Sequence, residues 1–146
     1  MKRERFKLPC SVFLLLRRED EILLLRREKT GWMDGYYSVP AGAIDGNEEA
    51  SLAACREAKE ESCVVLNKED LSLKHVIHCY TDGDEWMGVF FAATEYQGVP
   101  SIGEPEKHAD MHWCKVNALP EKMIPYVRQA IENIERDIAF STYGWN

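Results

Sequence analysis

The sequence predicts an α/β fold in which helices lie on both sides of a single sheet. Strand-like apolar runs alternate with segments of helical character, and the runs carry apolar side chains at consecutive positions. A strand of that kind is buried on both faces, so helices must cover the sheet on each side. The chain has 146 residues, which is the size of one domain. We therefore expect a single domain over residues 1–146.

The first two strands are predicted at 12–17 and 21–26, where the cores read VFLLL and ILLL. The polar tip 18–20 separates them, which is typical of a β-hairpin. Residues 36–40 predict a short strand, and residues 42–46, with glycine at both ends, predict a loop or brief strand.

A helix is predicted from Glu48 to about Ser62, with Asn47 as its N-cap. This segment contains no Gly or Pro and is rich in Ala, Glu, Lys and Leu. An asparagine side chain accepts hydrogen bonds from the unpaired N–H groups of a first turn, and acidic side chains are favoured there.

Two further strands are predicted at 71–81 and 85–95, joined by the turn 82–84. Both carry apolar residues at odd and at even positions, so both of their faces are buried and they belong in the middle of the sheet. A loop over 97–110 and a last strand over 112–116 come next along the chain.

Pro125 opens a C-terminal helix that presents one apolar stripe. Its members repeat at intervals of three and four: Ile124, Val127, Ile131, Ile134 and Ile138. Such a stripe packs either on the sheet or on a partner subunit, so a homodimer is one expectation.

Charge is sorted along the chain. The net charge of −7 argues against broad attraction to nucleic acid or acidic lipid, so neither a nucleic acid polymer nor a membrane is expected as a partner. Residues 1–29 carry nine basic and five acidic side chains, whereas residues 42–64 carry six acidic and two basic ones. The acidic segment is either a solvated helix face or is neutralised by a bound cation.

The five cysteines are predicted to be reduced and mostly buried thiols, because their number is odd and no two are spaced as CxxC. The apolar run 12–16 is stopped by two arginines and is too short for a signal-peptide core, which favours a cytoplasmic protein.

The strongest chemical signal is the spacing of Glu57, Glu60 and Glu61. On a helix these positions share an arc of about 100°. Carboxylate oxygens suit hard cations such as Mg²⁺, which also retain water and bind substrate phosphates. Glu48 lies about 180° from Glu57 around an ideal helix, so an ion pair with Arg56 is expected for it instead.

These residues resemble the signature box of the Nudix (MutT-like) hydrolases, which reads G, five residues, E, seven residues, then REUxEExGU, where U is apolar. Residues 42–64 match six of its specified positions, with Gly42, Glu48, Arg56, Glu57, Glu60 and Glu61. Two positions depart from it. Ala58 is smaller than the usual aliphatic residue, and Cys63 replaces a glycine. Because a left-handed cysteine would be strained by about 1 kcal/mol, we expect a different helix end there.

The resemblance implies a Nudix-type α/β/α sandwich with a mixed β-sheet. It also implies a hydrolase that uses a divalent metal, Mg²⁺ or alternatively Mn²⁺, to cleave a nucleoside diphosphate linked to another group. By position, the metal ligands would be Glu57, Glu60, Glu61 and the carbonyl of Gly42. One of these acids or a loop glutamate would deprotonate water, and Arg56 would hold the acids in place. The catalytic candidates are accordingly Arg56, Glu57 and Glu60.

Weaker candidates lie outside the box. Arg26 or Arg27 would contact substrate phosphate, with a surface ion pair as the alternative, and only one of two adjacent strand side chains points into a site. Glu104 and Glu106 stand in the loop where similar enzymes place a further carboxylate, or are merely exposed. Aromatic side chains that stack on a base or else belong to the core are Trp32, Tyr36, Trp86, Phe90 and Trp113.

His108 and His112 have the spacing of a zinc-protease pair, but Ala109 replaces the glutamate and the segment does not read as a helix. No zinc site is expected. The first substrate hypothesis is a nucleoside triphosphate cleaved in the MutT-like manner, including oxidised dGTP. ADP-ribose and dinucleoside polyphosphates are alternatives, the latter because Tyr80 falls 16 residues after Val64. The rival from another class is a non-catalytic nucleotide sensor, dimerised through the isoleucine stripe.

Overall fold

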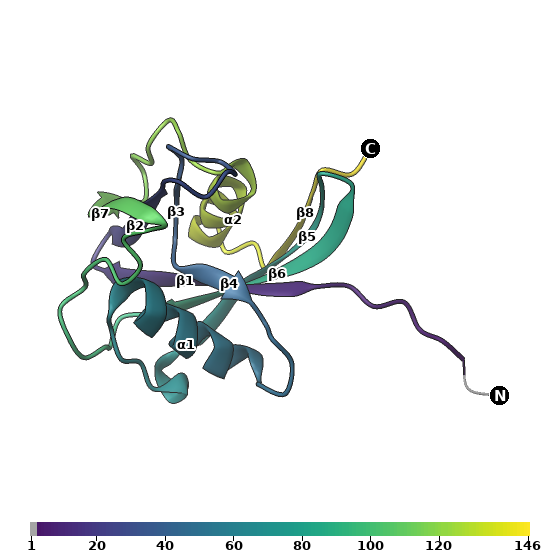
Figure 1. Ribbon diagram of the computed structural model, residues 1–146, viewed down its shortest axis with the longest axis horizontal. Helices are drawn as coiled ribbons and strands as arrows, with labels where there is room; N and C mark the ends of the chain where they lie inside the picture. Colours follow the sequence, from purple (N-terminus) through teal and green to yellow (C-terminus); the bar gives the residue numbers. More distant parts are fainter. Residues whose placement is uncertain (1–2) are drawn as a thin grey trace.

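The computed structural model describes residues 3–146 and places two helices on opposite sides of a mixed sheet (Figure 1). Lys2, part of the basic N-terminal segment, lies outside the described residues. The strands are β1 (Cys10–Arg18), β2 (Glu21–Arg27), β3 (Tyr37–Ser38), β4 (Ala41–Ala43), β5 (Ser72–Thr81), β6 (Asp84–Ala93), β7 (His108–Lys115) and β8 (Phe140–Tyr143). The helices are α1 (Ala50–Ser62), the 3₁₀ helix η1 (Lys68–Asp70) and α2 (Pro125–Glu135). The α/β/α sandwich predicted from the sequence is confirmed. None of the helices in residues 3–146 has the length and apolar character that crossing a bilayer requires.

The sheet has the strand order β3-β2-β1-β6-β5-β8, with β4 paired to β1 and β7 paired to β2. The β1–β6 and β5–β8 pairs are parallel. Strands β1 and β2 form the predicted hairpin but pair only near its tip, at Arg17↔Ile22 and Arg18↔Glu21. Beyond the tip the two strands diverge, and β4 pairs with the edge of β1 that this leaves, over residues 11–13. The divergence therefore allows β4 to lie beside α1.

Side chains of β1 alternate between two cores. Phe13 and Leu15 belong to the core under α2, whereas Leu14 and Leu16 belong to the core under α1, and all four are at most 5% exposed. The isoleucine stripe of α2 packs into the first of these cores. Because the stripe packs inside the domain, it is not available as the dimer surface that the homodimer and the dimeric sensor would need.

Helix α1 begins at Ala50, and Glu49 rather than Asn47 precedes its first turn as the N-cap. The predicted start at Glu48 is therefore wrong. Asn47 has a φ of 56° and comes after Gly46 with a φ of 89°, so these residues form a left-handed turn. An N-cap needs extended backbone, and Asn47 cannot supply it in this conformation.

Three other boundaries differ from the prediction. Strand β7 begins at His108 instead of residue 112, because it pairs with β2 along the whole length of that strand. Helix α2 ends at Glu135, so Ile138 lies beyond it. Strand β8, which the sequence does not predict, is a short strand that is held by parallel pairing with β5.

Helix α1 ends at Cys63, which has a φ of 61° and donates its N–H to the carbonyl of Lys59. The expectation of a different helix end is wrong, because the cysteine adopts the left-handed conformation of the glycine that it replaces. All five cysteines are free, but Cys63 is exposed and only Cys79 and Cys114 are fully buried. Cys10 and Cys55 are half-buried, so the prediction of mostly buried thiols is confirmed for only two of the five cysteines.

Candidate functional site

Helix α1 lies close to the sheet because its inner face is built from alanines. Ala53, Ala54 and Ala58 are at most 1% exposed and pack in the cores that contain Val12 and Leu14 of β1. Small side chains at a close-packed contact permit a short separation between helix and sheet. The small residue at position 58 thus helps to bring the neighbouring acids of the helix down to β4.

Glu57 lies against the backbone of β4 at Gly42. A Cβ atom at Gly42 would collide with the carboxyl group of Glu57, so a side chain at position 42 requires this carboxyl group to move. Burial raises the pKa of Glu57, and the guanidinium of Arg56 partly offsets that effect. Glycine at this position gives the carboxylate direct access to the strand backbone.

Glu61 is the most deeply buried acid of the site, with 7% of the residue exposed. Its Oε1 accepts the N–H of Ala41 in β4 at 2.9 Å. The pKa of Glu61 is raised to about 8, mainly by burial and also by the charges of Glu57 and Glu104, against the opposing effect of the Ala41 N–H. A buried acid surrounded by other acids is a group that a cation would stabilise in its charged form.

Arg56 connects the acids on both sides of the α1 N-terminus. Its guanidinium donates to Glu48 at 2.8 Å and to Glu57 at 2.8 Å, and it lies 3.4 Å from Glu60. It also donates to the carbonyl of Ala43 in β4. The ion pair between Glu48 and Arg56 that the helical angle predicts is present, and Glu48 lies just before the helix.

The loop before β7 docks on the C-terminal end of α1. Ser101 donates its N–H to Ser62, and Gly103 donates its N–H to the carbonyl of Glu61 at 3.0 Å. A Cβ atom at Gly103 would collide with the helix backbone, so the loop approaches α1 as closely as glycine permits. This docking carries Glu104 close enough for its charge to raise the pKa values of two acids of α1.

Of the two loop glutamates, Glu104 joins the acids and Glu106 is exposed. Glu104 is half-buried and lies 3.4 Å from the ammonium group of Lys107. The charge of Glu106 raises the pKa of His108, and this effect is smaller than the lowering by burial. Of these two candidates, only Glu104 has a position that suits a further carboxylate of the site.

Arg26 and Arg27 end β2 and have different neighbours. Arg27 donates to the carbonyl of Trp32 at 2.9 Å, and its guanidinium lies 4.9 Å from the centre of the Trp32 ring. Arg27 pairs with His108 across β2 and β7, and His108 lies 3.7 Å from Glu61, so Arg27 is on the side of the acids. Arg26 instead approaches Tyr37, and its buried Nε has no hydrogen-bond partner among the described residues. Arg27 is thus the better placed of the two for a phosphate beside the acids.

His108 is a member of this site that the sequence did not reveal. Its Nε2 lies 3.7 Å from Oε2 of Glu61, and the residue is 6% exposed. Burial lowers its pKa to about 4, so the imidazole is neutral at pH 7. The one sequence signal at His108 is its spacing to His112, and that spacing does not indicate a contact with Glu61 of α1.

The donor set suits a hard divalent cation. Carboxylate oxygens from α1 and a backbone carbonyl from β4 are the ligands that Mg²⁺ and Mn²⁺ accept. In residues 3–146, no three acidic, histidine or cysteine side chains converge as a ready metal cage. Arg56 explains this arrangement, because it binds Glu57 and also contacts Glu60. The residues fit the metal in number and in the chemistry of their donor atoms.

A hollow of about 480 Å³ lies between β1, β6 and α2. Its lining combines aromatic with acidic side chains: Phe13, Trp32, Trp86, Tyr126, Asp82, Asp84 and Glu85. Ser11 also lines it and pairs with Ala43, the neighbour of Gly42. Phe13 belongs to the core under α2, so the hollow lies on the α2 face of the sheet, whereas α1 and its acids cover the other face.

The five aromatic candidates have different environments. Phe90 is fully buried and stacked on Phe13, so it belongs to the core, and Trp113 packs in the core under Arg18. Tyr36 is partly buried against the α2 core. Trp86 is partly buried and shares the hollow with Trp32, which is 39% exposed. Trp32 and Trp86 are thus the two candidates that line an open space.

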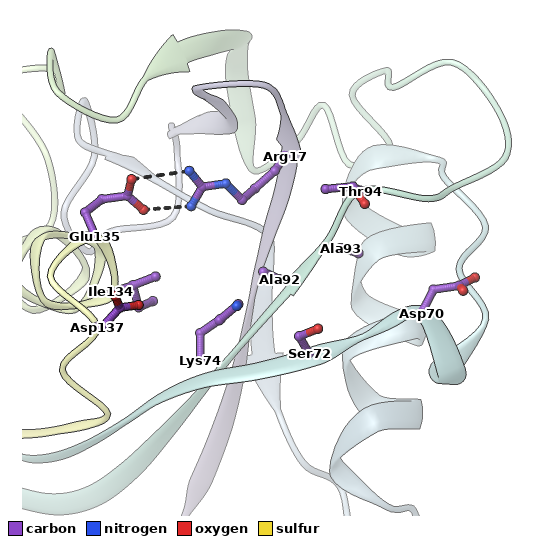
Figure 2. A pocket seen from close by; sticks show the side chains of 10 residues that line it. All are labelled: Arg17, Asp70, Ser72, Lys74, Ala92, Ala93, Thr94, Ile134, Glu135 and Asp137. Carbon is purple, nitrogen blue, oxygen red and sulfur yellow. Dashed lines mark hydrogen bonds and ion pairs between the residues drawn. The ribbon is translucent and has the colours of Figure 1, made fainter.

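A second hollow of about 370 Å³ lies at the far end of the same strands, and Figure 2 shows Arg17 and Glu135 facing each other across it. Both carboxylate oxygens of Glu135 accept from Arg17. Lys74 and Asp137 also line this hollow. Its charges are already paired or mixed in sign, and none of the box residues lines it.

Comparison with known proteins agrees with this geometry. A family model described as NUDIX domain matches residues 7–134. The crystal structure of a MutT NUDIX hydrolase from Burkholderia pseudomallei superposes with a TM-score of 0.79 at 26% identity, covering 87% of this chain and 98% of that chain. A NUDIX hydrolase structure from Nitrosomonas europaea has a TM-score of 0.76 at 20% identity, covering 92% and 93% of the two chains, and shows the shared fold. The chain therefore belongs to the Nudix family, whose members are hydrolases that act on phosphoric anhydrides.

Two curated relatives carry more specific names. An NAD-capped RNA hydrolase NudC of Pseudomonas fluorescens is 30% identical over 115 residues, covering 78% of this chain and 39% of the relative. An RNA pyrophosphohydrolase of Acidiphilium cryptum is 26% identical over 141 residues, covering 86% of this chain and 85% of the relative. This chain thus spans about two fifths of the first relative.

Proposed function

We propose that this chain is a Mg²⁺-dependent pyrophosphatase that cleaves the phosphoanhydride bond of a nucleoside diphosphate derivative, with residues 42–64 as its catalytic segment in a single domain. The observation that carries the proposal is the meeting of Gly42, Glu57 and Glu61 at the contact between α1 and β4. Carboxylates occupy this contact, and apolar packing would have stabilised the fold more simply.

Each residue of the set has its own role in this proposal. Glu57, Glu60, Glu61 and the carbonyl of Gly42 would hold the metal, with Mn²⁺ as an alternative to Mg²⁺. A metal bound there lowers the pKa of water and neutralises phosphoryl oxygens. Arg56 keeps the acids oriented through its contacts with Glu48 and Glu57. A carboxylate of the set takes the proton from the attacking water.

The aromatic hollow suits the nucleoside part of such a substrate. Trp32 and Trp86 offer stacking faces, and the acidic rim at Asp82 and Asp84 accepts hydrogen bonds from a base edge. Arg27 lies next to Trp32 and on the side of the acids, so a phosphate there would connect the two parts of the substrate.

A nucleoside triphosphate is the first candidate substrate, cleaved to a monophosphate and pyrophosphate in the MutT-like manner, with oxidised dGTP included. The relative named RNA pyrophosphohydrolase, which this chain matches over most of both lengths, favours the triphosphorylated 5′ end of RNA as the second candidate. Both substrates present the same phosphate chain to the acids. They differ in the group attached to the 3′ side of the first nucleoside, and the negative net charge disfavours a nucleic acid polymer at that position.

The test is a substrate panel with matched variants. The panel contains nucleoside triphosphates, oxidised dGTP, ADP-ribose, diadenosine polyphosphates, NAD and 5′-triphosphorylated RNA, each with Mg²⁺, with Mn²⁺ or with a chelator. We expect metal-dependent turnover that Glu60→Gln lowers by about 10²-fold or more. Glu69→Gln, an exposed acid outside the site, is the control and should retain full activity.

The outcomes separate the alternatives. Turnover of RNA but not of free nucleotides supports the second candidate. Nucleotide binding without turnover in any metal supports the sensor and contradicts the enzyme. Equal activity of Glu60→Gln and Glu69→Gln would exclude Glu60 from the catalytic set.

A further inference from the structure

His108 lies at the junction of the docked loop and β7. It is the first residue of β7 and stands opposite Arg27 of β2 in the sheet register. Its N–H donates to the carbonyl of Glu104 at 3.1 Å, which closes the turn that carries the loop glutamate. With 6% of the residue exposed, the ring has little freedom to move.

The imidazole lies beside one carboxyl oxygen of Glu61, and the backbone of β4 donates a hydrogen bond to the other. Oε1 of Glu61 accepts the N–H of Ala41 at 2.9 Å, and Oε2 lies 3.7 Å from Nε2 of His108. When Glu61 is deprotonated, as cation binding requires, a neutral imidazole that carries its proton on Nε2 is a donor toward Oε2. The distance is longer than a hydrogen bond, as is common in a catalytic site before its ligands are bound.

The other ring nitrogen gives an independent observation. Nδ1 of His108 is buried and has no hydrogen-bond partner among the described residues. A buried polar atom without a partner costs about 1–3 kcal/mol, so a residue chosen only for packing would more simply be apolar. The remaining nitrogen, Nε2, is the one that faces Glu61.

We propose that His108 is a positioning residue that fixes the carboxylate of Glu61 for divalent cation binding, and this inference rests on the proposed function of that site. The Ala41 N–H binds Oε1, and the His108 Nε2 lies beside Oε2 on a different side, within reach once that distance shortens. The oxygen lone pairs of Glu61 that these two groups do not contact are then held in one orientation and remain available to a cation. A carboxylate that is already oriented loses less conformational freedom when it binds a cation, and partners of this kind typically affect metal affinity by about 10- to 100-fold.

Two substitutions distinguish the proposal from a general packing role. The amide nitrogen of glutamine reaches approximately the place of Nε2, whereas that of asparagine reaches approximately the place of Nδ1. We expect His108→Asn to weaken Mn²⁺ binding by about 10- to 100-fold. His108→Gln should stay within about threefold of the wild type. Free Mn²⁺, measured by electron paramagnetic resonance without nucleotide, gives the affinity.

Activity and stability are measured on the same proteins. His108→Asn should lower kcat with little change in KM for the nucleotide, and the thermal midpoints of the two variants should be alike. His112→Asn is the matched control: it lies on the same strand, contacts Asp110, and should retain Mn²⁺ affinity. Equal Mn²⁺ affinity in the Asn and Gln variants, whether both fall or neither does, would overturn the proposal.

A measurement on the wild-type chain covers the case in which the variants do not fold. The ring signals of His108 should shift in nuclear magnetic resonance spectra as Mg²⁺ is added, while those of the buried His75, which bonds to Ile138 and Ser141, should not. Unmoved His108 signals at saturating Mg²⁺ would contradict the proposal. Because the metal measurements need no turnover, the proposal remains testable even if the substrate panel finds no hydrolysis.

Discussion

The two helices cover opposite faces of one sheet, yet they are built for different purposes. Helix α2 buries Val127, Ala130, Ile131 and Ile134, all apolar, and makes an ordinary core. Helix α1 buries alanines together with Glu61 and Ser62. A helix that buries an acid sacrifices stability for a site, whereas the buried face of its counterpart is entirely apolar and contributes none of the acids. Substitutions in the two helices should therefore affect different measurements.

The largest expected effect is on stability, in α2. Ile131→Ala removes a fully buried side chain from the core under α2 and should lower the free energy of unfolding by about 3–4 kcal/mol. Turnover per folded molecule should not change below the thermal midpoint. Denaturant unfolding measures the first quantity, and Glu132→Ala on the exposed side of α2 is the control. A loss of kcat as large as the loss of stability would show that α2 shapes the site after all.

The next effect is on catalysis, at the contact of α1 with β4. Gly42→Ala places a methyl group where the Glu57 carboxyl lies, and a misplacement of about 1 Å lowers turnover by about 10²-fold. Ala43→Ser, one residue on and exposed, should be nearly silent. Steady-state kinetics with the best substrate of the panel measures both variants. Full activity of Gly42→Ala would mean that Glu57 does not act from the position it has here.

These helices also differ in how far the sequence predicts them. Periodicity predicts the α2 stripe, because apolar packing leaves its pattern in one segment. The spacing of Glu57, Glu60 and Glu61 likewise predicts a shared arc. The start of α1 is mispredicted because the left-handed turn at Gly46 and Asn47 overrides the capping preference of asparagine.

Contacts between distant segments are what the sequence does not reveal. His108 meets Glu61 only because β7 pairs with β2 from its first residue, and β8 exists only because β5 offers it an edge. The resemblance to the Nudix box supplies Gly42 as a partner of the acids. Without it, no local pattern indicates that a glycine 15 residues before Glu57 would lie against that side chain.

A smaller effect concerns the pH dependence of the metal-free protein. The pKa of Glu61 is about 8 in the folded chain, against an ordinary value near 4.5, mainly because of burial. As pH rises from 4.5 to 8, the unfolded chain loses this proton while the folded chain keeps it, so stability falls across that window. Glu61→Gln removes this loss and should gain on the order of 2 kcal/mol relative to the wild type between pH 4.5 and pH 8.

Unfolding in urea with a chelator, at about pH 5 and about pH 8, measures this difference. Glu69→Gln is the matched control, since Glu69 is exposed and lies outside the site. Saturating Mg²⁺ should reverse the comparison and make the wild type the more stable protein at about pH 8. Parallel pH profiles for Glu61→Gln and the wild type would contradict the burial of an acid in α1.

The smallest effect lies at the C-terminal end of α1, where the site meets the loop. Cys63 has a φ of 61°, a conformation that glycine adopts without a steric cost, so Cys63→Gly should raise the free energy of unfolding by about 0.5–1 kcal/mol. Cys63→Ala keeps the strained backbone and removes the thiol, so it should bring no such gain. Thermal unfolding of the three proteins separates these contributions. An equal gain in both variants would assign the cost to the exposed thiol instead of the backbone. The expected result would show that Cys63 destabilises the end of the helix that carries the acids. The C-cap of α2, Arg136, has a φ of −104° and no such strain.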